Sequence, residues 1–101
     1  MSIFTKQGEV STTGTVIHVG QSIPVSTVLT LRFFNASAYV LTLQRYSRKS
    51  NTLLTIYELT LSAGDQIVDT TPYILETGDY LKATSDIVGT NYFIEGQDSW
   101  I

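Results

Sequence analysis

Residues 25–46 read VSTVLTLRFFNASAYVLTLQRY and contain two runs of leucine, β-branched and aromatic residues, separated by Asn35-Ala36-Ser37. The first run extends from Val25 to Phe34 and the second from Tyr39 to Tyr46. Both alternate with a period of two, which is the spacing of side chains along a β-strand. Asn and Ser are common turn residues. The stretch therefore predicts two successive strands joined by a short turn.

The same pattern extends along the rest of the chain. It predicts further strands at Thr15 to Val19 and Leu53 to Leu61, with shorter ones near Tyr73, Tyr80 and Tyr92. Gly-Asp pairs at residues 64–65 and 78–79 indicate turns between them. Many short strands with regular turns are typical of sandwiches and jelly rolls. We expect an all-β fold, an antiparallel β-sandwich or jelly roll of about seven to eight short strands.

The chain length, 101 residues, is enough for one domain. Residues 1–14 contain few large apolar residues and are predicted to form an N-terminal arm, with Phe4 as its best anchor. Residues 15–101 are predicted to form a single β-sandwich domain. We expect the arm to become ordered only against a partner.

The composition excludes several classes of function. There is no cysteine and only one histidine, His18, which lies between Ile17 and Val19 and is expected to have a structural or surface role. Asp65 and Asp79 each follow a glycine and are predicted to be turn residues, with ion binding as the alternative, and no phosphate-binding loop is present. The sequence therefore predicts a protein that is not an enzyme and needs no metal or cofactor. A net charge of −3 argues against binding to nucleic acid. No signal peptide or membrane-spanning run is visible, so we expect synthesis without export.

The predicted strands have apolar residues on both faces, which leaves two explanations for the second face. Either the N-terminal segment or loops cover it, or another subunit does. We expect self-association, with Phe34, Tyr46 and Trp100 among the buried contacts. Trp100 would fold back on its own domain or dock on a neighbour. Arg45, Arg48 and Lys49 form a basic group that is either a solvated hairpin tip or a docking site for an acidic surface.

Residues 59–83, LTLSAGDQIVDTTPYILETGDYLKA, together with Phe33-Phe34-Asn35, form a pattern of turns and strands. This pattern resembles small β-sandwich structural proteins of tailed bacteriophage particles. The resemblance implies a virion component, either a head decoration or cement protein that binds the major capsid protein non-covalently, or a neck or tail adaptor. A glycan-binding or host-surface-binding module is the alternative, because six tyrosines and Trp100 could stack on sugars.

Overall fold

The computed structural model describes residues 2–20 and 25–99, which contain nine strands and no helix. The strands are β1 (Ser2–Glu9), β2 (Thr15–Val19), β3 (Val25–Phe34), β4 (Tyr39–Ser47), β5 (Thr52–Leu61), β6 (Gln66–Asp69), β7 (Tyr73–Leu75), β8 (Tyr80–Ser85) and β9 (Asn91–Ser99). The prediction of an all-β antiparallel sandwich is confirmed. The expected number of strands was too low, because the pattern predicts neither β1 nor β6.

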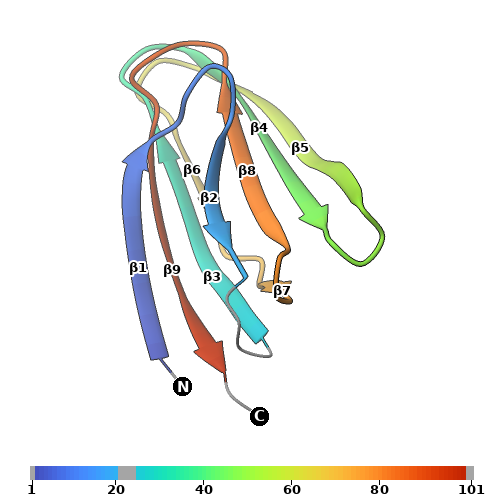
Figure 1. Cartoon of the computed structure of the whole chain (residues 1–101). Helices are drawn as coiled ribbons and strands as arrows, with labels where there is room; N and C mark the ends of the chain where they lie inside the picture. The colour runs from blue at the N-terminus through green and yellow to red at the C-terminus, as the bar shows by residue number, and fades with distance from the viewer. Residues whose placement is uncertain (1, 21–24, 100–101) are drawn as a thin grey trace.

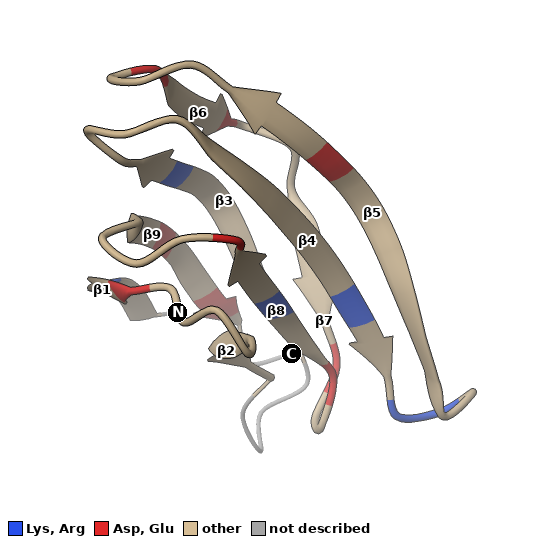
Figure 2. Cartoon of the chain, turned by 90° about the horizontal axis from the view of Figure 1, so that it is seen from above, with Lys and Arg blue, Asp and Glu red and all other residues tan. Residues whose placement is uncertain are grey.

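Two antiparallel sheets pack face to face (Figures 1 and 2). The first sheet has the order β1-β9-β3-β6, and β7 pairs with the other half of the same edge of β3. The second sheet has the order β2-β8-β4-β5. The two strands of residues 25–46, β3 and β4, therefore lie in different sheets. Asn35 supports this crossing, because its side-chain amide donates to Val88 O at 3.1 Å and to Thr90 Oγ1 at 2.8 Å.

The inner faces of the two sheets form one hydrophobic core. β3 and β4 contribute alternate residues to it, as period-two patterning requires. The buried apolar residues are Val10, Ile17, Val28, Leu31, Phe33, Tyr39, Leu41, Leu43, Ile67, Tyr73, Leu75, Leu81, Ala83 and Ile94. Every residue on this list comes from a strand except Val10, which follows β1.

The N-terminal segment differs from the predicted arm. Residues 2–9 form β1, which pairs with β9 along its whole length, from Ser2 opposite Asp98 to Glu9 opposite Asn91. Pairing of this kind satisfies backbone groups and needs few apolar side chains. Phe4, Lys6 and Gly8 lie on the same face of β1, and the charged Lys6 interrupts the apolar alternation that would predict a strand. Its charge is accommodated by a contact with His18.

The outer face of the first sheet is not covered by the N-terminal segment, which lies at the edge of that sheet (Figure 1). Leu29, Phe34, Val68 and Ile74 are all exposed. Within the described residues, the explanation that the N-terminal segment covers the second face is therefore wrong.

Candidate interaction surfaces

The β4–β5 hairpin carries the predicted basic group. Its turn spans residues 48–51, and Asn51 N donates to Arg48 O at 3.3 Å. Asn51 adopts a left-handed backbone conformation with φ of 50°, which asparagine tolerates well. Arg48 and Lys49 are exposed at this tip.

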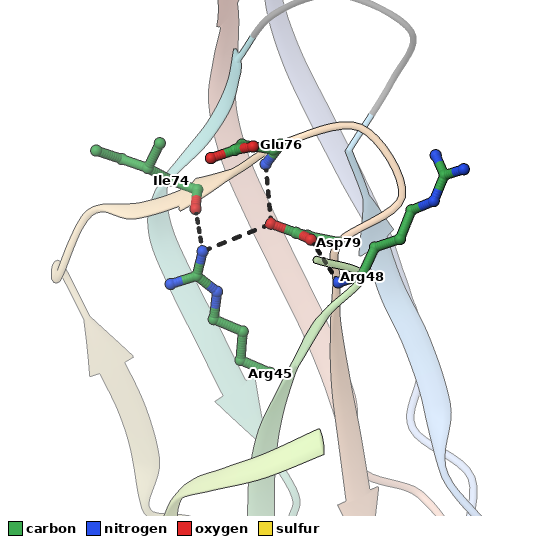
Figure 3. A network of polar contacts seen from close by, with 5 residues as sticks. All are labelled: Arg45, Arg48, Ile74, Glu76 and Asp79. Carbon is green, nitrogen blue, oxygen red and sulfur yellow. Dashed lines mark hydrogen bonds and ion pairs between the residues drawn. The ribbon is translucent and has the colours of Figure 1, made fainter. Parts of the chain in front are cut away.

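Arg45 is held by the protein itself. Its Nη2 donates to the Ile74 carbonyl at 2.6 Å and lies 3.7 Å from Asp79 Oδ2. Buried Asp79 also accepts hydrogen bonds from Glu76 N at 3.1 Å and Arg48 N at 2.8 Å. In Figure 3 the Arg48 guanidinium points away from this network. The predicted basic group is therefore divided: Arg45 joins the hairpin to the β7–β8 connection, and Arg48 and Lys49 face solvent.

Tyr46 makes contacts within its own chain. Its ring stacks on Tyr80 with 4.8 Å between centroids, and its hydroxyl donates to Asn51 Oδ1 at 2.6 Å. Its role in self-association stays a prediction. Trp100, another predicted aromatic contact, lies outside the described residues.

Phe4 contacts His18 of the same chain, and its contact with a partner stays a prediction. The two rings are stacked, with 4.3 Å between centroids and an interplanar angle of 10°. Lys6 Nζ lies 2.9 Å from His18 Nδ1, and Ser26 Oγ lies 2.6 Å from Nε2. An ammonium group can only donate, so Nδ1 accepts and Nε2–H donates to Ser26. This cluster closes the side of the sandwich between β1 and β2.

The sequence predicts either a structural or a surface role for His18. The structure places the imidazole of His18 in the interior, which favours the structural role. Burial and the charge of Lys6 lower its pKa from 6.5 to about 4, against an opposing effect of Asp98. A neutral imidazole fits its two contacts. Ser26 is also fully buried, so the His-Ser pair has no surface at which a substrate could be attacked.

The opposite side of the sandwich, between β5 and β6, is open. Ile56, Leu59, Ile67 and Val68 line a groove of about 530 Å³ there. At this groove Asp69 joins the two sheets, because its Oδ2 accepts from Tyr57 of β5 at 3.0 Å and from Tyr73 of β7 at 2.6 Å.

The ionisation of these three groups follows from the contacts. Burial alone would raise the pKa of Asp69, but the hydrogen bonds from Tyr73, Thr71 and Tyr57 outweigh it and lower that pKa below 3.8. Burial and the bonds to Asp69 raise the pKa of both tyrosines. A charged carboxylate held by two neutral phenols is thus the stable form at neutral pH.

Strand β5 is an exposed edge of the second sheet. It has ten residues and, among residues 2–20 and 25–99, pairs only with β4. Leu53, Leu54, Ile56 and Leu59 are exposed, Leu54 to 64%. Figure 2 shows one charged band on this strand, which is Glu58. A long apolar edge with free backbone groups is a template for another strand.

Phe34 lies in a second groove, of about 690 Å³, on the outer face of the first sheet. This groove is also lined by Arg32, Tyr92 and Phe93, and by the amides of Gln7, Gln66 and Asn91. It lies at the end of the sheet where β1 and β3 finish and β9 begins. The residues come from four strands.

The described residues contain no group of three or more His, Asp or Glu side chains that could hold a metal ion. None of them lies in a helix long and apolar enough to cross a membrane. Comparison of the sequence with models of known protein families and with curated proteins gives no match.

Sequence reasoning missed Arg32 and the β5 edge. Arg32 occupies an outward position between Leu31 and Phe33, which is an ordinary place for a polar residue. Its neighbours in the groove are far away along the chain. Only the strand register, in which Arg32 is opposite Phe93 and Phe93 is opposite Gln7, brings them together.

Proposed function

We propose that the protein is a non-enzymatic structural subunit of a bacteriophage particle, which self-associates and attaches non-covalently to other virion proteins such as the major capsid protein. The resemblance of residues 59–83 to phage sandwich proteins supports this function. These residues form two turns with Gly64 and Gly78 at positive φ, of 79° and 89°, followed by strands β6 and β8. A neck or tail adaptor would use the same chemistry of attachment.

The observation that carries self-association is the unprotected edge of β5. Proteins protect sheet edges with charges, short strands or bulges. Here β1 carries Lys6 and Glu9, β2 has five residues and β6 has four. β5 has ten residues and only Glu58 as a charge, and its one irregularity is the register shift opposite Leu43 and Gln44. It is therefore the edge most open to another strand.

A second copy of β5 fits this edge in an antiparallel arrangement. The register shift leaves Ile56 unpaired with β4 and separates a regular segment from Tyr57 to Leu61. With a twofold axis at Leu59, Glu58 faces Thr60 of the second copy, so like charges do not meet. Leu59 faces its own copy, and the added strand would extend the second sheet over the open β5–β6 groove. Such isologous contacts are the commonest route to homodimers.

The oligomeric state tests this part of the proposal. Sedimentation equilibrium at high micromolar concentration should show a dimer for the wild-type protein. Leu59→Lys should give a monomer, because two ammonium groups would meet at the axis. Val88→Lys is the matched control, since Val88 is 77% exposed and lies in a loop away from β5. A wild-type monomer, or a dimer of Leu59→Lys, would contradict assembly through this edge.

Attachment to a particle needs a separate experiment. Phage particles produced without this gene should be mixed with the purified protein and sedimented. We expect the protein to sediment with the particles at a fixed ratio to the major capsid protein. Its complete absence from the particle fraction would contradict a virion function.

A further inference from the structure

We propose that the outer groove of the first sheet, centred on Arg32, binds a carbohydrate that carries carboxylate groups. This site is independent of the β5 edge and goes beyond the assembly function. Three observations carry the proposal: a guanidinium group without a partner, aromatic rings beside it, and side-chain amides around the rim.

Arg32 is exposed and lines the groove. Its cross-strand neighbours are Phe93 on β9 and Val68 on β6, neither of which carries a charge. Within the described part of the chain, its guanidinium makes no hydrogen bond or ion pair. An arginine of this kind is suited to hold a carboxylate through two parallel hydrogen bonds.

Acidic groups do occur nearby, and none neutralises Arg32. Glu95 lies on the same face, opposite Thr30 and diagonal to Arg32, but within the described residues the two side chains form no ion pair. Glu9 accepts a hydrogen bond from Gly89 N at 3.2 Å. Asp69 is opposite Leu31, and its carboxylate is held by Tyr57 and Tyr73. The charge of Arg32 is therefore available to a ligand.

The remaining groups fit a sugar. Phe34 is 44% exposed and, with Phe93, offers an apolar surface to the C–H groups of a pyranose ring. The amides of Gln7, Gln66 and Asn91 can each donate to and accept from hydroxyl groups. Apolar walls with a few convergent polar groups are characteristic of ligand sites.

Two other classes of ligand fit less well. An extended peptide binds by adding a strand to a free sheet edge, whereas this groove crosses the face of strands that are already hydrogen-bonded to one another. Nucleic acid requires several cations, and among the described residues that line the groove Arg32 is the only cationic one.

The test compares acidic saccharides with neutral ones that have the same rings. Sialyllactose is paired with lactose, and a short oligogalacturonate is paired with its methyl ester. Binding is measured by titration of amide signals in ¹⁵N NMR spectra, which also show where the ligand sits. We expect at least one acidic probe to shift the signals of Arg32, Asn91 and Phe93, and its neutral counterpart to bind about tenfold more weakly or worse.

Substitutions identify the site. Arg32→Gln should weaken binding of the acidic probe about tenfold or more, to the level of the neutral one. Phe34→Ser should weaken both, because it removes ring contact without changing charge. Arg48→Gln is the matched control, because it removes another exposed arginine. Arg48 lies in the β4–β5 hairpin, at the end of the sandwich away from the groove (Figure 1), so its substitution should leave binding unchanged.

Three results would overturn the proposal. The first is the absence of binding by both acidic probes at millimolar concentration, and the second is equal affinity for acidic and neutral probes. The third is a loss of binding in Arg48→Gln that equals the loss in Arg32→Gln. The Leu59→Lys variant should bind the acidic probe as the wild type does, so failure of the assembly model and failure of this site are distinguishable.

Discussion

Asp79 and Asp65 occupy equivalent places after Gly78 and Gly64, yet their side chains have different surroundings. Asp79 is buried and accepts hydrogen bonds from two backbone N–H groups. Asp65 is exposed, and it is its backbone carbonyl that accepts a bond, from the hydroxyl of Tyr39. The sequence explains both equally as turn residues, and the difference depends on what packs over each turn.

This difference predicts unequal effects of two matched substitutions. Asp79→Ala leaves two backbone donors without an acceptor and should lower the free energy of unfolding by about 3 kcal/mol. Asp65→Ala should change it by less than about 0.5 kcal/mol. Urea unfolding followed by circular dichroism measures both. Equal decreases in the free energy of unfolding for the two variants would show that the carboxylate of Asp79 does not stabilise the hairpin.

The pKa of His18, which is about 4 in the folded protein, makes stability dependent on pH. The unfolded chain has the higher pKa, near 6.5, and binds the proton more tightly, so protonation favours unfolding. The His18 contribution should be fully present above pH 6.5, decrease as pH falls from 6.5 to 4, and become constant below 4.

Two variants separate this effect from the titration of carboxylates. His18→Gln should lose the part of the pH dependence between 6.5 and 4, as measured by urea unfolding. Lys6→Met removes the adjacent positive charge and should raise the pKa of His18 in an NMR titration. An unchanged pKa of His18 in Lys6→Met would mean that the charge of Lys6 does not contribute to it.

Among the strands, β9 and β3 are held in close contact by the lack of a side chain at Gly96. A Cβ atom at this position would collide with the Thr27 carbonyl and with the ring of Phe4. The register of β3 shifts just beyond this point, between Val28 and Thr30. Gly96 thus fixes how β1, β9 and β3 lie together.

Gly96→Ala should therefore lower the free energy of unfolding by about 3 kcal/mol, because backbone must move to admit the methyl group. Gly64→Ala is the comparison. Gly64 has a positive φ but no atom near its Cβ position, so only a conformational cost of about 1 kcal/mol applies. Thermal unfolding of both variants provides the measurement, and a smaller loss for Gly96→Ala would contradict the close contact.

The sequence predicts strands well where both alternating positions carry strand-forming residues, as in β3, β4 and β5. It fails for β1, because pairing with β9 supplies backbone hydrogen bonds that no side-chain pattern reveals. The interaction surfaces are predicted less well. Arg45 appeared free and is bonded to Ile74, while Arg32 was overlooked, because both facts depend on the register between distant strands.

At the scale of the whole molecule, the contact of Tyr57 and Tyr73 with Asp69 is a polar link between the sheets on their open side. Asp69→Asn removes the charge that both phenols donate to and should lower the free energy of unfolding by about 2 kcal/mol at pH 7. Since the folded pKa lies below 3.8, this stabilisation is present above pH 3.8 and lost as pH falls through the folded value.

A double-mutant cycle tests whether the link acts as a unit. Tyr57→Phe should cost about 1 kcal/mol, and in combination with Asp69→Asn should cost less than the sum of the two. Strict additivity in chemical denaturation would mean that the two side chains stabilise the fold independently.

The antiparallel pairing of β1 with β9 also fixes how the molecule can be mounted on a support. Ser2 and Asp98 are opposite each other at one end of the first sheet, while Glu9 and Asn91 mark the other end, about 24 Å away for a strand of this length. Ser2 and Ser99, the first and last described residues, both lie at the end away from Arg32 and Phe34. Coupling to a sensor chip or bead through either of these two residues would therefore direct the groove outward. The β4–β5 hairpin, which carries Lys49, also lies away from the end of the first sheet that holds the groove, so immobilisation through this lysine would leave the groove accessible as well.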